Sequence, residues 1–225
     1  MSQFHIRRVA VLGAGVMGAQ IAAHLVNARI PVLLFDLPSS EGPDKSAIAN
    51  KAIAALTKMK PAPLGRASDA ALIQAANYDD HLSQLKTCDL VIEAVFEEMG
   101  VKEAVFKKLD EVMKPGAILA SNTSALPIEE IAGHVSNPGR TVGIHFFNPA
   151  PLMPLVEIIP AVQTAPNFLS SALELIQSWK KITVVCKDTP GFIVNRVARP
   201  FYGEALRIYD EGIADFATID WAMTN

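Results

Sequence analysis

Short apolar runs alternate with amphipathic segments along most of this chain. The apolar runs are rich in Val, Ile and Leu and stand between polar or glycine-containing turns, which is typical of parallel strands buried on both faces. The segments between them space their apolar residues as one face of a helix does. Strands are predicted at residues 9–12, 30–36, 77–78, 89–94, 116–121, 140–147, 155–159 and 182–187, and helices after the first strand and at 45–60, 69–76, 101–113 and 167–179. This alternation predicts an α/β fold with a doubly wound, mostly parallel sheet.

The pattern changes after residue 188. From Thr189 onward only helical spacing is present, and helices are predicted at 200–212 and from 217 onward. We therefore divide the chain into an α/β domain at residues 1–188 and the beginning of an all-helical C-terminal domain at residues 189–225. The chain ends inside an amphipathic pattern, without a cap or a polar tail, so we expect it to be the front part of a longer protein.

Three glycines follow the first apolar run at the spacing G-x-G-x-x-G, namely Gly13, Gly15 and Gly18. The first allows a tight turn, the second lets backbone approach a pyrophosphate, and the third lets the next helix pack closely on the strand. The pyrophosphate is expected at the start of that helix, where Val16 and Met17 lie, because the helix dipole favours negative charge there. A strand, a glycine turn and a helix in this order predict a Rossmann-like, dinucleotide-binding domain.

The acid at the end of the second predicted strand indicates which dinucleotide binds. Asp36 follows Gly18 by 18 residues, close to the roughly 20 expected for a carboxylate that binds the adenosine ribose. Such a carboxylate accepts hydrogen bonds from the ribose hydroxyls and repels a 2′-phosphate, and no basic residue directly follows the strand. The pattern therefore indicates NAD rather than NADP. The alternative is that Asp36 is only a turn residue before Pro38.

Composition narrows the classes of partner. The chain has 225 residues, of which 50% are hydrophobic and 19% charged, and its formal net charge is −3. It has no basic excess that would bind nucleic acid. Residues 9–28 carry no charged side chain and are long enough to span a bilayer. Because the glycine turn interrupts them and Gln20, His24 and Asn27 share one predicted helix face, we expect no membrane segment.

Cysteines and most histidines give no sign of chemistry. Cys88 and Cys186 are far apart and have no cysteine or histidine close in sequence, and the first eight residues lack a secretory signal. We therefore expect a reducing, cytoplasmic compartment, buried cysteines and no metal site. Four histidines stand among polar neighbours and are expected to be solvated: His5, His24, His81 and His134.

A second group of polar residues lies where the carboxyl ends of the strands are expected, which is where a doubly wound fold forms its cleft. Ser124 follows one strand and His145 closes another, while Glu157 lies in the next and Asn195 begins the helical part. A neutral imidazole at His145 suits a base that takes the proton of a substrate alcohol while hydride leaves the same carbon for a nicotinamide. Glu157 would orient the ring and stabilise the imidazolium, and Ser124 and Asn195 would hydrogen-bond the substrate.

Each of these residues also has a structural interpretation. His145 could be a core histidine, Ser124 could help the chain enter the following helix, and Asn195 could be an amide on a helix surface. Glu157 is harder to explain in this way, because it stands in an otherwise apolar strand and an unpaired buried carboxylate is costly. We therefore expect a cationic or protonatable partner for Glu157.

Five motifs stand in a fixed order along nearly the whole chain: Gly13-Ala-Gly-Val-Met-Gly18, Val91-Ile-Glu-Ala-Val-Phe-Glu-Glu98, Ala120-Ser-Asn-Thr-Ser124, His145-Phe-Phe-Asn-Pro149 and Lys187-Asp-Thr-Pro-Gly-Phe-Ile-Val-Asn-Arg196. Together they resemble the 3-hydroxyacyl-CoA dehydrogenase family of fatty-acid β-oxidation. The resemblance implies NAD-dependent oxidation of (S)-3-hydroxyacyl-CoA to 3-ketoacyl-CoA. It implies a base at His145 oriented by Glu157, with Ser124 and Asn195 near the substrate. It also implies cofactor contacts at Asp36, Glu97, Lys102, Ser124 and Asn148.

The resemblance extends to partners. It implies an acyl-CoA substrate and, for the full-length protein, a homo-oligomer or a fusion to an enoyl-CoA hydratase domain, since residues 37–43 and 58–64 look similar to bacterial fusion proteins. Lys51, Lys58 and Lys60 either bind CoA phosphates or form a solvated face. Two other functions stay open: a β-hydroxyacid dehydrogenase that uses a lysine as acid and base, and a protein that binds the cofactor without turnover.

Overall fold

The computed structural model describes residues 6–225, so His5 and the start of the chain lie outside the described residues. The strands are β1 (Val9–Leu12), β2 (Val32–Asp36), β3 (Ile73–Asn77), β4 (Leu90–Glu93), β5 (Ile118–Ser121), β6 (Thr141–Phe146), β7 (Leu155–Pro160) and β8 (Ile182–Val185). The α-helices are α1 (Val16–Asn27), α2 (Ala47–Leu56), α3 (Met99–Val112), α4 (Ile128–Ala132), α5 (Pro166–Ser178), α6 (Val194–Asp210) and α7 (Phe216–Thr224). Short 3₁₀ helices span Ala67–Leu72, Leu82–Thr87 and Pro138–Arg140.

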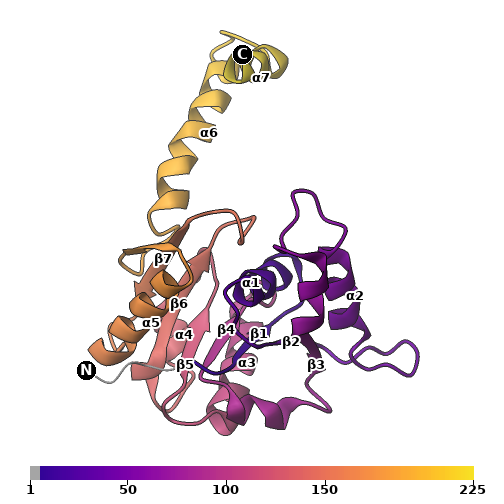
Figure 1. Ribbon diagram of the computed structural model, residues 1–225. Coiled ribbons are helices and arrows are strands. Elements are labelled where there is room, and N and C mark those ends of the chain that lie inside the picture. Colours follow the sequence, from indigo (N-terminus) through magenta and orange to yellow (C-terminus); the bar gives the residue numbers. More distant parts are fainter. Residues whose placement is uncertain (1–5) are drawn as a thin grey trace.

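The strands form one sheet in the order β3-β2-β1-β4-β5-β6-β7-β8. Neighbouring strands from β3 to β6 are parallel, β7 runs antiparallel to β6, and β8 is parallel to β7. Helices cover both faces of the sheet, and α6 leads away from it (Figure 1). The predicted α/β, Rossmann-like fold with a mostly parallel sheet is therefore confirmed. Because parallel strands end at the same edge of the sheet, the loops that follow them meet there.

The core has two layers, one on each face of the sheet. Within β1, Val9 and Val11 belong to the apolar cluster that includes α1, α2 and α5, whereas Ala10 and Leu12 belong to the cluster that includes α3 and α4. All four side chains are completely buried. Successive side chains of a strand point to opposite faces, so a strand covered on both sides needs an unbroken apolar run.

Two elements differ from their predicted extents. The segment predicted as a helix at residues 69–76 is the end of a 3₁₀ helix followed by β3, because Ile73–Asn77 pairs with β2 at the edge of the sheet. This pairing outweighs the helix propensity of the alanines there. Helix α6 begins at Val194, before the predicted start, and continues through Pro200, which removes one backbone donor.

Helices α6 and α7 bury none of their residues. Figure 1 shows α6 pointing away from the sheet, with α7 at its far end. The exposed apolar and aromatic side chains of α6 are Val197, Phe201, Tyr202, Leu206 and Tyr209. Within residues 6–225, none of the helices has the length and apolar character needed to cross a bilayer.

The turn between β1 and α1 depends on close backbone contacts. Gly13 has a φ of +98°, and a Cβ added there would lie 2.5 Å from the carbonyl oxygen of Ala94. A Cβ added at Gly18 would lie 1.8 Å from the carbonyl oxygen of Gly13. By contrast, no atom lies within 4 Å of a Cβ added at Gly15. The fold therefore requires glycine at 13 and 18, while the space at Gly15 is left open.

Alanine substitutions should separate these two roles. Gly18→Ala forces backbone apart and should lower the free energy of unfolding by about 3 kcal/mol or more. Gly15→Ala, the matched control, adds the same methyl group in open space at a helix N-cap and should change that free energy by less than about 1 kcal/mol. Urea unfolding followed by circular dichroism measures both. Equal stability of the two variants would contradict this account of the turn.

The prediction that His24 is solvated is wrong. It is 7% exposed, and its ring centroid lies 6.1 Å from that of Phe146 and 6.5 Å from that of Trp179. The supposed polar side of α1 is covered by the loop after β6, where the amide of Ala150 donates a hydrogen bond to Gln20 at 3.0 Å. His81 and His134 are half-buried.

Burial, with a smaller contribution from the charge of Lys181, lowers the pKa of His24 from 6.5 to about 4. Between these values the unfolded chain binds a proton that the folded protein does not, so acid favours unfolding. For this residue alone, the free energy of unfolding should fall by about 2 kcal/mol between about pH 7.5 and about pH 5. The variant His24→Leu should lack this part of the pH dependence in urea titrations. An unchanged pH dependence in the variant would show that the folded protein accepts the proton.

Candidate functional site

Two adjoining cavities lie at the edge of the sheet where the parallel strands end. The first has a volume of about 430 Å³ and is lined by the glycine turn, Asp36 and the loop after β4. The second has a volume of about 510 Å³ and shares Gly15, Ala94 and Val95 with the first. Predicted site residues that line the second are Val16, Met17, Glu97, Lys102, Ser124, His145, Asn148 and Asn195. The structure thus brings residues predicted to contact the cofactor and residues predicted to act in acid–base chemistry to one cleft.

Asp36 stands at the end of β2, beside the glycine turn. Its Oδ2 accepts a hydrogen bond from the amide of Ala14 at 2.6 Å, and its Oδ1 accepts one from the amide of Leu37 at 2.7 Å. These bonds fix the carboxylate at the wall of the first cavity. Two aromatic residues that the sequence analysis missed, Tyr78 and Phe96, line the same cavity. Both residues follow the end of a strand, β3 or β4, and this position could have predicted that they line the cleft. A carboxylate beside apolar walls suits a ribose joined to a flat base.

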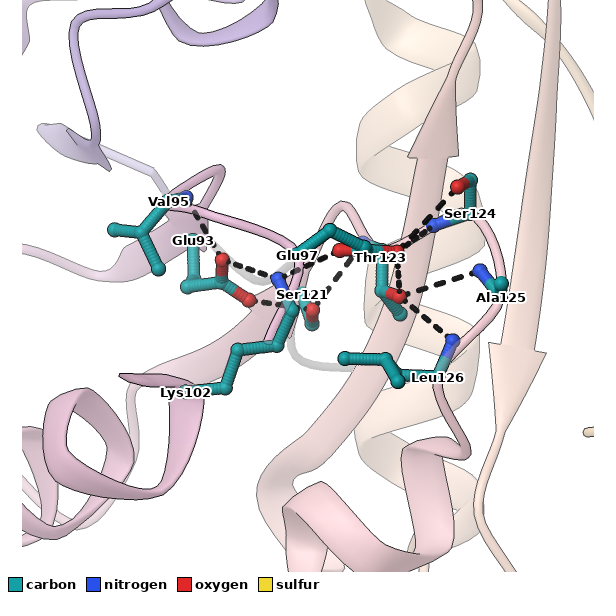
Figure 2. A network of polar contacts seen from close by, with 9 residues as sticks. All are labelled: Glu93, Val95, Glu97, Lys102, Ser121, Thr123, Ser124, Ala125 and Leu126. Carbon is teal, nitrogen blue, oxygen red and sulfur yellow. Dashed lines mark hydrogen bonds and ion pairs between the residues drawn. The ribbon is translucent and has the colours of Figure 1, made fainter. Parts of the chain in front are cut away.

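A buried network of charges joins β4, β5 and α3 (Figure 2). The ammonium of Lys102 lies 2.7 Å from Glu93 Oε1 and 3.0 Å from Glu97 Oε2. Lys102 is 1% exposed and Glu93 is completely buried. Glu93 also accepts hydrogen bonds from the amide of Val95 at 2.8 Å and the hydroxyl of Ser121 at 2.6 Å. A buried charge of either sign is tolerated only with such partners.

Glu97 is the carboxylate of this network that reaches the cleft. Its side chain is 40% exposed, and its Oε1 accepts hydrogen bonds from the hydroxyl of Thr123 at 2.5 Å and the amide of Ser124 at 2.9 Å. Burial alone would raise the pKa of Glu97, but the hydrogen bond from Thr123 and the charge of Lys102 outweigh it and lower the pKa. Lys102 therefore supports an ionised Glu97 from the buried side. Sequence reasoning missed Glu93. Like Glu157, Glu93 is a carboxylate in an otherwise apolar strand, and this pattern could have identified it.

His145 and Glu157 form a buried pair. They stand directly opposite each other in the antiparallel register of β6 and β7, so their side chains project from the same face of the sheet. His145 Nδ1 lies 2.7 Å from Glu157 Oε2, and Glu157 has no exposed surface. The other oxygen, Oε1, accepts hydrogen bonds from the amides of Ile193 at 3.0 Å and Val194 at 2.8 Å. Glu157 thus has the protonatable partner expected of it.

The remaining predicted residues surround this pair. Ser124 follows β5, Asn148 follows β6, and Asn195 lies in the first turn of α6, and all three line the cavity that His145 lines. Asn122, which sequence reasoning missed, lines the same cavity and accepts a hydrogen bond from the amide of Phe146 at 2.9 Å. It fixes the end of β6 next to the end of β5.

The loop from β6 to β7 is held from outside. The ammonium of Lys181, which follows α5, donates hydrogen bonds to the carbonyl oxygens of Ala150 at 2.6 Å and Met153 at 2.7 Å. Gln20 holds the amide of Ala150. These contacts keep the connection between the two strands of the His145–Glu157 pair in place.

Comparisons with known proteins give the family. Residues 8–189 match the model described as 3-hydroxyacyl-CoA dehydrogenase, NAD binding domain, and residues 191–225 match that of the C-terminal domain. The chain is 40% identical to 3-hydroxyadipyl-CoA dehydrogenase of Escherichia coli (strain K12), over 97% of this chain and 46% of that protein. It is 38% identical to 3-hydroxybutyryl-CoA dehydrogenase of Clostridioides difficile, over 96% of this chain and 76% of that protein. The crystal structure of M. tuberculosis FadB2 has a TM-score of 0.83 and 34% identity, covering 95% of this chain and 75% of that one.

The match to the NAD-binding domain includes every strand of the sheet, from β1 to β8. The chain spans about half of the length of the Escherichia coli relative, 46%. The five ordered motifs and the matched family model agree, which confirms the predicted resemblance. The chain belongs to the 3-hydroxyacyl-CoA dehydrogenase family.

Proposed function

We propose that the protein containing this chain is an NAD-dependent dehydrogenase that oxidises (S)-3-hydroxyacyl-CoA to 3-ketoacyl-CoA in fatty-acid β-oxidation. The observation that carries this proposal is the His145–Glu157 pair, whose imidazole lines the same cavity as the start of α1. A base beside a dinucleotide site is what hydride transfer from an alcohol requires. Acyl-CoA is the proposed substrate, and a homo-oligomer or a fused hydratase domain stays a prediction.

The residues of the glycine turn fit NAD. Gly15 leaves open space where a side chain would stand, and as N-cap of α1 it provides no side-chain hydrogen bond to the first helical amides. Those amides, near Val16 and Met17, are therefore available to a pyrophosphate. Asp36 would hold the adenosine ribose, and Glu97, Ser124 and Asn148 would contact the other end, with Lys102 behind Glu97. When bound, NAD supplies the hydride acceptor.

His145 is the proposed base. Because Glu157 occupies Nδ1, the Nε2 atom is the ring nitrogen left to accept the proton of the 3-hydroxyl. The imidazolium that forms lies against the Glu157 carboxylate, which stabilises its charge, and it returns the proton in the reverse direction. Ser124 and Asn195 would hydrogen-bond the substrate oxygens. A lysine as the base is disfavoured, since the ammonium of Lys102, the lysine that lines this cavity, is held by two carboxylates.

Replacing the base should abolish most turnover without affecting cofactor binding. In the complete protein, His145→Gln should lower kcat for the reduction of acetoacetyl-CoA by NADH by about 10²–10⁴-fold. The dissociation constant of NADH should change little, because His145 acts on the substrate. His134→Gln, which alters a histidine outside both cavities, is the control. Near-normal turnover of His145→Gln would remove this residue from the mechanism, and binding of NADH by a wild-type protein without turnover would leave only a cofactor-binding function.

Removing the charge of Asp36 should weaken the preference for NAD. In Asp36→Asn, hydrogen bonds to the ribose hydroxyls weaken and repulsion of a 2′-phosphate is lost, so the ratio of NADPH to NADH dissociation constants should fall by about tenfold or more. Glu41→Gln removes an exposed charge from the loop after β2 and should leave the ratio unchanged. Fluorescence titration with both nucleotides measures the two constants. An unchanged ratio in Asp36→Asn would support its interpretation as a turn residue only.

A further inference from the structure

The chain turns sharply between β8 and α6, directly beside the acid–base pair. At the centre of the turn, Phe192 has a φ of +47°, a left-handed conformation that is rare for a bulky side chain. Its side chain is nonetheless 3% exposed. Such strain persists only where the surroundings hold it, and it is concentrated at functional sites.

This turn directs two backbone amides at Glu157. The amides of Ile193 and Val194, which follow Phe192, both donate to Glu157 Oε1. The carboxylate therefore has one oxygen engaged by the backbone and the other, Oε2, facing His145 Nδ1. An ionised carboxylate accepts hydrogen bonds and donates none, so the proton of this contact belongs to Nδ1, and in the neutral ring Nε2 is left unprotonated. The orientation of Glu157 thus decides which ring nitrogen can act as a base.

The ring of Phe192 makes a second contact with the pair. Its centroid lies 5.7 Å from that of the His145 imidazole, at an interplanar angle of 60°. Phe147 also contacts the imidazole, with centroids 4.5 Å apart. Phe192 differs from Phe147 because its backbone also sets the amides that hold Glu157.

We propose that Phe192 is a positioning residue of the acid–base pair: its left-handed backbone aims the amides of Ile193 and Val194 at Glu157, and its ring packs on His145. The two contacts together fix the tautomer and the orientation of the imidazole. They also tie the start of α6, and with it Asn195, to the base through a single carboxylate. The catalytic meaning of this inference rests on the proposed function, whereas the tautomer of His145 does not.

Nitrogen NMR of the histidine-labelled chain tests the tautomer directly. In the wild-type protein near neutral pH, Nδ1 of His145 should show the shift of a protonated nitrogen and Nε2 that of an unprotonated one. In Phe192→Val, whose β-branched side chain strongly disfavours a positive φ and which removes the ring, the two shifts should move toward each other. The amide protons of Ile193 and Val194 should also lose the downfield shift that a carboxylate acceptor gives. Phe192→Leu, which keeps apolar bulk, should restore part of both effects.

Phe147→Leu is the matched control, because it removes the other aromatic contact and leaves the turn intact. It should keep the wild-type tautomer and the wild-type amide shifts. The proposal is overturned if Phe192→Val keeps both sets of shifts, or if the wild-type protein carries its proton on Nε2. The wild-type measurement and Phe192→Leu decide the question even if the valine variant fails to fold.

Turnover separates this proposal from the proposed function. In the complete protein, Phe192→Leu should lower kcat with acetoacetyl-CoA by about ten- to a hundredfold, the effect of a small misplacement of a base, while KM for NADH stays unchanged. A parallel rise in KM for NADH would indicate a general structural defect and contradict a positioning role. Absence of turnover in the wild-type protein would count against the proposed function, and the NMR result would still decide the role of Phe192.

Discussion

Two carboxylates buried at the edge of the sheet set the architecture of the cleft. Glu93 and Glu157 have no exposed surface, and a buried carboxylate destabilises the fold unless several donors surround it. Glu93 gathers its donors from the loop after β4, from β5 and from α3. Glu157 gathers its donors from β6 and from the start of α6. Each carboxylate therefore joins elements that are distant in sequence, one on the side of the cleft proposed to hold the cofactor and the other on the side proposed for acid–base chemistry.

Much of this arrangement can be predicted from the sequence because local signals coincide with the global fold. Apolar runs mark the strands, the glycine spacing marks the first turn, and Asp36 follows at the expected distance. The anomaly of Glu157 in an apolar strand predicts its pairing without knowledge of the partner. The roles of the site residues and the division of the chain near residue 188 stay predictions.

The features that the sequence did not predict all depend on contacts with elements that are distant in sequence. A helical wheel assigns His24 to a polar face, but α1 lies between neighbours on more than one side, so that face is buried too. The alanines near residue 75 favour a helix, but backbone hydrogen bonds to β2 make this segment a strand. The left-handed conformation of Phe192 has no signal in its own residue type, because bulky residues rarely adopt it, and the amide that follows bonds to a carboxylate in another strand.

Lys181 and Gln20, from other elements, hold the connection between β6 and β7 through hydrogen bonds to its main-chain groups. Main-chain groups are the same for almost every amino acid, so this anchoring does not depend on which side chains the loop carries. Side-chain changes at residues 151–153 should therefore leave these hydrogen bonds in place. The loop depends instead on Lys181 and Gln20, which lie outside it. Loss of either side chain would release a segment that contains neither residue.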